Sequence, residues 1–395
     1  MRILQVTPCY IPAYRYGGPV KSVHELSRTL VKKGVDVTVF TTNANGPTNL
    51  NVPTDSELLL DGVKVHYFPV QKPRSYFFSL SLSKALKRQI RTFDIVHINW
   101  LYVHPTMAAA RECFRQGVPY LLAPRGMLDS NAIAMKGSLK KRLYLNLIER
   151  EHLTRAERVH FTSDGERNGA ISVKWQVQPV IVSNGLDFEQ LDQPHDSTLF
   201  YKRFPEVAGK KLALCLGRLN YIKGLDLMAK AWPSVVQAVP ESHLVLVGPD
   251  ENGYSKKIRR WLYEGGVGDS VTLTGLLLGE EKNAALKAAD VFVASSHLES
   301  FGMAIVEAMA FRKAVVVTDR VNISFYIKKA KAGLVVPCDA SKLSEAIISL
   351  MKNPQERVAM GERGLRLVRE KYTWDRAAEE MLQVYRTVLA NGNQP

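Results

Sequence analysis

The chain has 395 residues, more than one hydrophobic core usually serves, so its length favours two domains. Apolar residues make up 46% and charged residues 23%, values that exclude a disordered or fibrous chain. The net charge of +15 is concentrated in residues 1–185, where 25 Lys and Arg stand against 13 Asp and Glu, and this implies either an anionic partner or a merely soluble basic surface.

The first half of the chain alternates strand-like and helical runs, the pattern of a doubly wound α/β domain. A helix is expected over 19–33, where apolar residues recur at helical spacing and Gly34 follows as a C-terminal stop. The expected strands are 1–7, 35–41, 63–68, 95–98, 120–123, 158–162 and 180–182.

The pattern restarts after residues 187–209, which are rich in Asp, Gln and Pro and are interpreted as a linker. Helices are expected over 224–239, with a kink or break at Pro233, and over 280–289, 303–311 and 375–390. The expected strands are 212–216, 243–247, 271–274, 291–294, 314–318 and 334–336. The sequence therefore predicts an α/β fold of two Rossmann-like doubly wound domains, 1–186 and 187–372, facing across a cleft, with a closing segment 373–395.

The sequence carries no sign of export, membrane insertion or a metal site. The apolar run at the start is too short for a signal peptide, and no stretch of about 18 apolar residues occurs, so a cytosolic protein is expected. The cysteines are far apart without a C-x-x-C pair, which favours neither zinc nor a disulfide framework, and two of them are expected in the core. The four are Cys9, Cys113, Cys215 and Cys338, of which the first and third are the core candidates.

Two motifs at the ends of predicted strands suit a bound anion. Gly17 and Gly18 precede the first helix, where glycine lets a ligand approach the backbone and a helix N-terminus attracts negative charge. A plain tight turn explains this pair equally well, and the dinucleotide fingerprint G-x-G-x-x-G is absent. Arg218 and Lys223 lie on the loop after the first strand of the second half, so we expect both cations to face the cleft and hold phosphate, rather than to be two surface cations. Gly224 permits the turn into the next helix.

The third motif combines two carboxylates with a helix N-terminus. Glu299 lies in the loop after strand 291–294, and Glu307 lies on the helix that begins near Gly302. Carboxylates accept hydrogen bonds from hydroxyls and the free backbone N–H groups donate, which suits a polyhydroxylated ligand. The alternative interpretation is a pair of solvated acidic residues, with Met303 belonging to the core.

These motifs, in this order, resemble the retaining glycosyltransferases of family 4, which have the GT-B fold. The matching pieces are the early Gly17-Gly18, Ser183-Asn184-Gly185-Leu186-Asp187, Gly217-Arg218 with Lys223-Gly224, Glu299-x7-Glu307 with Phe301-Gly302, and Tyr372-Thr373-Trp374. They span nearly the whole chain. The resemblance implies transfer of a sugar from a nucleotide-sugar donor to a saccharide or lipid-linked acceptor in polysaccharide or glycolipid biosynthesis.

The resemblance also implies a role for each matching residue. Arg218 and Lys223 would hold the donor diphosphate, Glu299 the transferred sugar and Glu307 the ribose, while the loop near Gly275 would meet the base. The last helix would cross back to the first domain. The implied donor-binding set is Gly17, Gly18, Arg218, Lys223, Gly275, Leu276, Glu299, Phe301, Gly302, Met303 and Glu307, with Arg218, Lys223 and Glu299 as its catalytic members.

The sequence departs from the family pattern at two positions. Many members have His where Arg125 stands in the stretch Pro124–Leu128, and an arginine does not act as a general base because it keeps its proton. Arg125 is therefore assigned to the acceptor side, where it stabilises negative charge or positions the acceptor. Arg312 stands where the family usually has a glycine, at the end of the helix expected over 303–311. We expect this difference to change a turn and not the chemistry.

The expected mechanism uses no metal and no protein nucleophile. No D-x-D pair occurs in the sequence, so fixed cations are expected to stabilise the departing diphosphate. The resemblance makes Glu299 a sugar-binding residue, which favours front-side attack, with the leaving phosphate taking the acceptor proton, over double displacement through a carboxylate.

Two basic, amphipathic segments suit an anionic membrane surface at the inner face of the membrane. Residues 74–91 and 138–150 each combine apolar and cationic side chains, and Ser138 is expected to cap a helix with Leu139, Leu143 and Leu147 inside. An ordinary amphipathic helix on a basic face is the alternative. For the whole chain the alternatives are a GT-B sugar-nucleotide epimerase and a non-catalytic sugar-nucleotide-binding module. A nucleic-acid partner is not expected, because the cations are not interleaved with exposed aromatic residues as in the known nucleic-acid-binding motifs.

Overall fold

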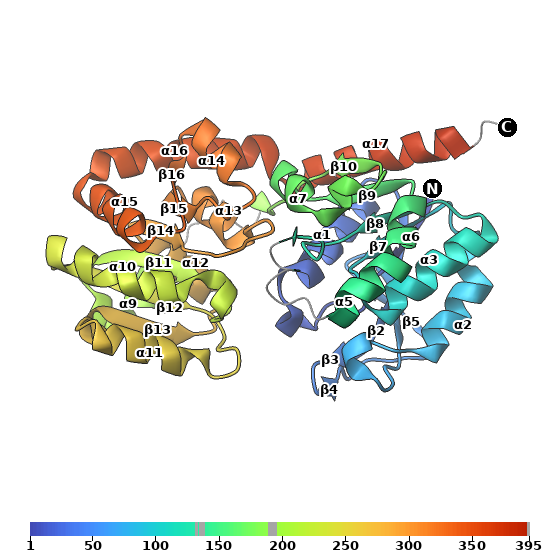
Figure 1. Ribbon diagram of the computed structural model, residues 1–395, viewed down its shortest axis with the longest axis horizontal. Coiled ribbons are helices and arrows are strands. Elements are labelled where there is room, and N and C mark those ends of the chain that lie inside the picture. The colour runs from blue at the N-terminus through green and yellow to red at the C-terminus, as the bar shows by residue number, and fades with distance from the viewer. Residues whose placement is uncertain (131–132, 134–138, 189–195, 393–395) are drawn as a thin grey trace. The chain divides into compact units, whose positions relative to one another are not determined.

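The computed structural model describes residues 1–130, 133, 139–188 and 196–392, and the chain divides into two compact units. Unit 1 consists of Met1–Gly185 and Trp374–Pro395, and unit 2 consists of Leu186–Thr373. Each unit is a mainly parallel sheet with helices packed on it (Figure 1). Both units have the doubly wound α/β fold that the alternating pattern predicts.

Unit 1 is built on a sheet that, in the described residues, has eight strands in the order β10-β9-β8-β7-β1-β2-β6-β5. Its pairs are parallel except β5, which runs antiparallel to β6. The strand order reverses between β1 and β7, so the loops after these strands are neighbours at the carboxyl edge. The strands are β1 (Arg2–Val6), β2 (Asp36–Thr42), β5 (Glu57–Leu60), β6 (Val63–Phe68), β7 (Ile95–Asn99), β8 (Tyr120–Ala123), β9 (Arg158–Phe161) and β10 (Pro179–Ile181), beside a small hairpin of β3 (Ala44–Asn45) and β4 (Thr48–Asn49).

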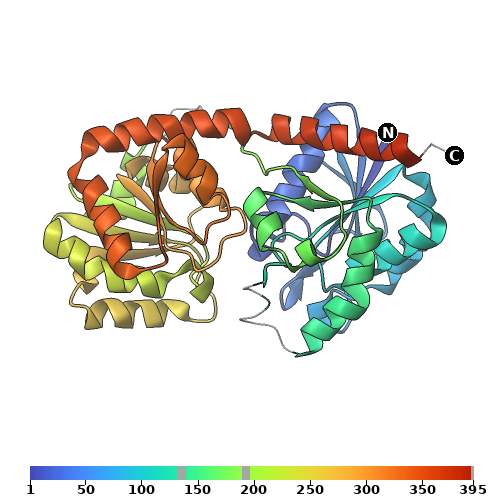
Figure 2. The same ribbon diagram turned by 45° about the horizontal axis from the view of Figure 1, so that its top comes forward.

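The helices of unit 1 connect these strands, and the last helix of the chain joins them. α17 packs against α1, and Figures 1 and 2 show it lying along unit 1. The helices are α1 (Gly18–Lys32), α2 (Leu80–Gln89), α3 (His104–Gln116), α5 (Leu139–Tyr144), α6 (Arg150–Arg155), α7 (Asp164–Gly169) and α17 (Trp374–Gly392), with a π-helical turn at Leu145–Glu149 and short 3-10 turns η1 (Tyr14–Tyr16), η2 (Arg74–Tyr76), η3 (Ile90–Thr92) and η5 (Ile171–Lys174).

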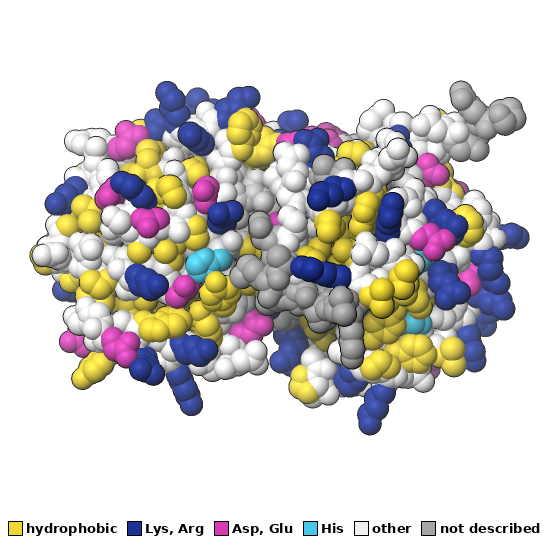
Figure 3. Space-filling model, viewed as in Figure 1, with side chains coloured by type: hydrophobic (Ala, Val, Ile, Leu, Met, Phe, Trp, Pro, Cys, Tyr) yellow, Lys and Arg dark blue, Asp and Glu magenta, His cyan; other side chains and the backbone are white. Residues whose placement is uncertain are grey.

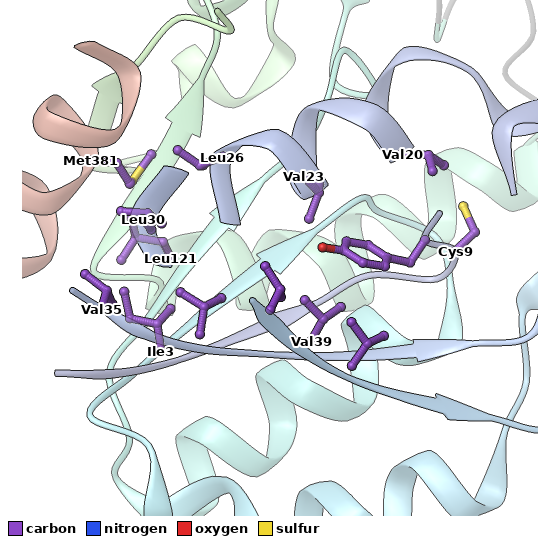
Figure 4. Packing of buried hydrophobic residues seen from close by; sticks show 14 of the residues in the cluster. Ile3, Cys9, Val20, Val23, Leu26, Leu30, Val35, Val39, Leu121 and Met381 are labelled. Atoms are coloured by element: carbon purple, nitrogen blue, oxygen red, sulfur yellow. The ribbon is translucent and has the colours of Figure 1, made fainter. Parts of the chain in front are cut away.

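The apolar stripe of α1 attaches this helix to the sheet. Val20, Val23, Leu26 and Leu30 recur at helical spacing, and each is at most 3% exposed. Figure 4 shows them on the side of α1 that faces the strands carrying Ile3 and Val39, with Leu26 and Leu30 near the α17 residue Met381. Each fully buried side chain of this kind contributes about 1.5–3 kcal/mol, so the stripe holds the carboxyl edge and the N-terminus of α1 in a fixed relation.

Unit 2 is built on an all-parallel sheet that has six strands among the described residues, in the order β13-β12-β11-β14-β15-β16. The order reverses between β11 and β14, which makes the loops after these two strands neighbours. The strands are β11 (Lys211–Leu216), β12 (Ser242–Val247), β13 (Val271–Gly275), β14 (Val291–Ala294), β15 (Ala314–Thr318) and β16 (Gly333–Val336).

The helices of unit 2 include several that the sequence patterns did not predict. α11, α14, α15 and α16 have no predicted counterpart, although Asp339 and Asn353 cap α15 and α16 with their side chains. The helices are α9 (Thr198–Arg203), α10 (Leu225–Ala238), α11 (Tyr254–Glu264), α12 (Gly279–Ala288), α13 (Met303–Ala310), α14 (Ser324–Ala330), α15 (Ala340–Lys352) and α16 (Pro354–Lys371), with 3-10 turns η6 (Pro205–Val207), η7 (Tyr221–Lys223) and η8 (Gly268–Ser270).

Two predictions about unit 2 were wrong. The supposed linker 187–209 contains α9 and η6, whose Phe200 and Val207 are 3% and 0% exposed in the core; residues 189–195 lie outside the described part. Of the kink or break predicted at Pro233, the break does not occur, because α10 continues to Ala238 while its face around the fully buried Trp232 stays packed. Burial therefore outweighed the local composition in both places.

The amphipathic segment before β9 also differs from its prediction. Leu143 and Leu147 are 58% and 66% exposed instead of buried, while Leu145 and Glu149 are buried. The π-helical turn makes hydrogen bonds from residue i to i+5 and winds more residues into a turn than a regular α-helix, which rotates the apolar face. Ser138 and the side chains of residues 139–141 lie outside the described part.

Three smaller expectations have definite outcomes. Cys9 and Cys215 are buried as predicted, and the described cysteines are free thiols. Arg312 has φ +55°, so it adopts the left-handed conformation that glycine would favour there. No helix of the described chain is both long enough and apolar enough to span a membrane.

Candidate functional site

The predicted donor residues of unit 2 meet at the carboxyl edge of its sheet, where β11 and β14 are neighbours. The loop after β11 carries Arg218 and Lys223, and the loop after β14 carries Glu299. The two loops touch at Gly224, where φ is +61° and a Cβ atom would lie 1.8 Å from the carbonyl oxygen of Ser295. Only glycine permits this approach, so Gly224 both ends η7 and brings the loops together.

Lys223 and Glu299 form an ion pair across these loops. The Lys223 ammonium donates to Glu299 Oε2, with the two side chains 26% and 18% exposed. Backbone contacts hold the Glu299 loop on both sides, since His297 N donates to Ile222 O at 2.9 Å and Glu299 N donates to Arg320 O at 3.2 Å. The pair is therefore fixed by the scaffold and still reachable from solvent.

Arg218 has a carboxylate partner that the sequence patterns did not single out. Its Nη1 donates to Glu251 Oε2 at 3.3 Å, and Asn220 Nδ2 donates to the same oxygen at 2.6 Å. Glu251 lies after β12, the strand next to β11. The guanidinium is 48% exposed, so most of its donors remain available to an anion.

Glu307 is also paired, with a lysine from the neighbouring helix. Lys282 Nζ on α12 donates to Glu307 Oε1 on α13 at 2.8 Å, and the two side chains are 21% and 13% exposed. Each of the predicted charged residues of unit 2 thus has an internal partner of opposite charge. The pairs are Arg218 with Glu251, Lys223 with Glu299, and Lys282 with Glu307.

The remaining predicted donor residues surround these pairs with different exposure. Gly302 is the N-terminal cap of α13 with φ +86°, which leaves the first N–H groups of the helix free of an α-helical partner. Phe301 is 4% exposed and its ring packs against Tyr372, so its side chain belongs to the core, and Met303 packs partly on the core. Gly275 ends β13, and Leu276 after it is 54% exposed.

Gly17 and Gly18 belong to unit 1, where they open α1. Gly17 is its N-terminal cap with φ +84°, and Gly18 is its first residue, with no atom within 4 Å of where a Cβ would stand. An open helix N-terminus is suited to an anion.

Arg125 lies in a polar network at the carboxyl edge of unit 1. Its Nε and Nη2 both donate to Asn99 Oδ1, at 3.1 and 2.8 Å, and Nη1 donates to Asn184 Oδ1 at 3.4 Å. The residue has φ +53° between β8 and Gly126, a strained conformation. Burial lowers the pKa of Arg125 to about 10, so it stays protonated at neutral pH and does not act as a base.

A chain of buried hydrogen bonds lies beside this network. Tyr385 of α17 is 2.8 Å from His97 Nδ1, His97 Nε2 is 3.3 Å from His160 Nδ1, and His160 Nε2 is 2.8 Å from the carbonyl oxygen of Val182. Because that carbonyl can only accept, His160 donates to it, His97 donates to His160 and Tyr385 donates to His97. Each imidazole then carries one proton and is neutral. Burial accordingly lowers the pKa of His160 to about 3 and that of His97 well below its usual value.

The geometry of unit 2 suits a phosphorylated, hydroxyl-rich ligand. Fixed cations, carboxylates and a helix N-terminus gather there, and these groups bind phosphates and hydroxyls. In the described residues no group of three or more His, Cys, Asp and Glu is placed to hold a metal ion. Sequence reasoning missed Glu251 and Lys282 because their roles depend on contacts between loops of different strands, for which no local pattern exists.

Two family profiles match the chain, one in each half. Residues 17–185 match the glycosyl transferase 4-like domain, and residues 198–366 match the glycosyl transferases group 1.

Named proteins match over most of the chain as well. An O-antigen chain mannosyltransferase C of Escherichia coli is 26% identical, with 98% of this chain and 99% of that protein covered. A lipopolysaccharide core mannosyltransferase of Rhizobium leguminosarum bv. viciae is 29% identical over 61% of this chain and 74% of its own length. The crystal structure of the Anabaena protein Alr3699/HepE in complex with UDP-glucose has a TM-score of 0.76 at 17% identity, covering 98% and 100% of the two chains.

The chain belongs to the glycosyltransferases of the family 4 type, and it has the GT-B fold.

Proposed function

We propose that this family 4 type glycosyltransferase transfers a sugar from a nucleoside-diphosphate sugar to a saccharide or lipid-linked acceptor in polysaccharide or glycolipid biosynthesis. Unit 2 would hold the donor, and unit 1, with Arg125, would carry the acceptor side. The observation that supports the donor assignment is the meeting of Arg218, Lys223, Glu299 and Glu307 at one edge of the sheet.

The charges of this edge suggest how the donor binds. A diphosphate would exchange partners with the existing ion pairs, taking the cations of Arg218 and Lys223 from Glu251 and Glu299. The freed Glu299 carboxylate would then accept hydrogen bonds from the transferred sugar, and Glu307 from the ribose. Gly17 and Gly18 would help with the diphosphate from unit 1.

The proposed reaction retains the anomeric configuration without a protein nucleophile or a metal. The bond from the anomeric carbon to the phosphate oxygen breaks, the acceptor oxygen attacks from the same face, and its proton passes to the leaving phosphate. Arg218 and Lys223 stabilise the charge that develops on that phosphate. Trapping of a glycosyl adduct on Glu299, or loss of activity in a chelator with recovery on adding metal, would overturn this mechanism.

The similar proteins indicate which nucleotide-sugar donors to test first. The two curated proteins compared are mannosyltransferases, and the Anabaena structure holds UDP-glucose. A panel of UDP-, GDP-, ADP-, dTDP- and CDP-sugars therefore includes GDP-mannose and UDP-glucose as its leading members.

Thermal shift against this panel tests the donor site directly, because a ligand that binds only the native state raises the melting temperature. One nucleotide class should stabilise the native protein and lose its effect in Lys223→Ala and Glu307→Ala. Arg260→Ala serves as control, since Arg260 is 78% exposed and, within the described part of the chain, forms an ion pair only with Glu264 on its own helix. No shift with any nucleotide would contradict the donor site.

Product analysis separates the enzyme from its alternatives. Donor plus a saccharide or lipid-linked acceptor should yield a new glycoside with retained configuration. Conversion of donor alone into its 2-epimer would indicate the epimerase, and binding without turnover on any acceptor would indicate a non-catalytic module.

We further propose that one face of unit 1 contacts an anionic membrane at its inner, cytosolic side. A groove of about 800 Å³ lies between α3 and the α5–α6 segment, with Phe114 and Leu147 on its walls at 59% and 66% exposure. Figure 3 shows hydrophobic side chains beside many Lys and Arg on the part of unit 1 that carries these helices. The cations of this region are Lys84, Lys87, Arg88, Arg111, Arg115, Arg142, Arg150 and Arg155. Basic and apolar side chains together suit acidic lipid.

Vesicle pelleting tests this contact. Binding should rise with the fraction of anionic lipid and fall in Phe114→Asp with Leu147→Asp. Val358→Asp in unit 2 is the matched control, because Val358 is also exposed, at 65%, but lies on α16. Binding that ignores acidic lipid, or that Val358→Asp weakens equally, would exclude the proposed face.

A further inference from the structure

Lys282 stands out as a charged residue of the donor edge that no sequence motif accounts for. It lies in the first half of α12, and its ammonium contacts Glu307, which lies on α13. The two helices follow β13 and β14, so the contact joins a helix that follows an outer strand of the sheet to one that follows a central strand. The side chains are mostly buried, at 21% and 13% exposure, and this makes the pair more than a surface ion pair.

The pair leaves hydrogen-bonding capacity on both partners. An ammonium has three donors and a carboxylate has two acceptor oxygens. Among the described residues, Lys282 donates only to Glu307 Oε1, and Glu307 Oε2 receives no side-chain hydrogen bond. An N–H donor and a carboxylate acceptor are therefore available next to each other.

We propose that Lys282 and Glu307 form a two-point clamp for the vicinal hydroxyls of the donor ribose. A hydroxyl both donates and accepts. One ribose hydroxyl therefore donates to Glu307 Oε2, while the oxygen of one of the two ribose hydroxyls accepts from Lys282 Nζ. The clamp rests on the proposed function, in which Glu307 meets the ribose. It extends that function by adding Lys282 as a donor-binding residue and by making ribonucleotide donors preferred over 2′-deoxyribonucleotide donors.

Two physical effects give the clamp its selectivity. The ion pair holds the Glu307 side chain in place before the donor arrives, so less side-chain freedom is lost on binding. A ligand without the 2′-hydroxyl leaves a partly buried donor or acceptor unpaired, and sites built to bind a hydroxyl discriminate strongly against analogues that lack it. Deoxyribonucleotides should therefore bind at least about tenfold more weakly.

Calorimetry with nucleoside diphosphates and their 2′-deoxy forms tests the clamp. The native protein should prefer UDP or GDP, whichever it binds, over the 2′-deoxy form by about tenfold or more. Lys282→Met should weaken the ribonucleotide and leave the deoxyribonucleotide nearly unchanged, so the preference shrinks. Lys282→Arg keeps charge and donors and should retain much of it. Lys287→Met, an exposed lysine of the same helix, should keep the native preference.

The outcomes separate the clamp from the proposed function. Equal binding of the two nucleotide forms by the native protein, or equal weakening of both by Lys282→Met, would overturn the clamp, because the second result is that of a merely structural residue. Glu307→Gln should weaken the ribonucleotide. If it does not, the proposed place of the ribose is wrong; if it does while Lys282→Met retains the native preference, only the role of Lys282 is wrong. Melting temperatures confirm that each variant is folded.

Discussion

The carboxyl edges of the two units hold their polar groups in opposite ways. In unit 1, His97, His160 and Tyr385 are fully buried and joined in one chain of hydrogen bonds, and Arg125 is held by two asparagines. In unit 2 the charged groups form three separate ion pairs whose side chains keep 13% to 48% of their surface exposed.

This difference indicates at which edge a charged ligand can replace the existing partners of the polar side chains. Buried hydrogen bonds in a low-dielectric interior are costly to break, so the network of unit 1 is a fixed support. A partly exposed ion pair gains little by itself and is readily replaced when a doubly charged phosphate offers a stronger partner. We therefore expect substitutions of the ion-paired residues of unit 2 to act on chemistry and substitutions in the network of unit 1 to act on stability and positioning.

The largest effect is expected for Lys223→Met. Removing a fixed cation beside a departing phosphate should lower kcat/KM by about 10²–10³-fold, with little change in the melting temperature. Steady-state kinetics with the donor identified by thermal shift measures it. In Lys223→Met the Glu299 carboxylate loses its partner. The double variant Lys223→Met with Glu299→Gln removes this unpaired charge, so it tests whether that charge causes the loss of activity. A loss of only threefold in both variants would mean that the pair does not act on the reaction.

Gly224→Ala should be the most destabilising single change at the unit 2 edge. Its Cβ would stand 1.8 Å from the carbonyl oxygen of Ser295, where the loops that carry Lys223 and Glu299 touch, and we expect the free energy of unfolding to fall by about 3 kcal/mol. Gly253→Ala is the control, with a similar left-handed strain at φ +72° but open space around it, and should cost about 1–2 kcal/mol. Equal losses in urea unfolding would show that the close approach is not required.

Acid should weaken unit 1 through its histidines. The pKa of His160 is lowered to about 3 by burial, whereas the unfolded chain takes up this proton near 6.5. Below that pH the unfolded state binds more protons, so stability falls as the pH drops, by about 1.4 kcal/mol per pH unit for each such histidine.

Hydrogen exchange of the β7 and β9 amides, corrected for the intrinsic pH dependence, measures this loss. His160→Gln should flatten the dependence, and His66→Asn, a histidine 28% exposed on β6, should leave it as it is. Equal acid sensitivity in the strands of unit 2 would remove the contrast between the units.

The smallest effect is expected for Arg125→Lys. Lysine keeps the charge but makes a point contact in place of the two bonds to Asn99, so the acceptor KM should rise by about tenfold. The Kd of the donor nucleotide, measured by calorimetry, should stay unchanged. An equal change in donor affinity would mean that Arg125 does not belong to the acceptor side.

Local patterns predicted most strands before any contact was known, and the resemblance to family 4 implied the residues of the candidate donor site. Short apolar runs such as 291–294 became strands because fully buried parallel strands need continuous apolar sequence. Predictions from local patterns failed where burial depended on distant neighbours. Examples are Phe200 in the supposed linker and the π-helical turn that contains Leu147.

From the sequence by itself, hydrophobic periodicity predicted two α/β units, because periodicity is a local property of the chain. The order of its motifs resembles that of the family 4 glycosyltransferases, and this resemblance implied roles for Arg218, Lys223, Glu299 and Glu307. Only the tertiary structure decided that Glu251 and Lys282 pair with this set and that His97 and His160 are neutral. The physical reason is that ion pairs, burial and the pKa of a side chain depend on which loops the sheet order makes neighbours, and that order is not written in any single segment.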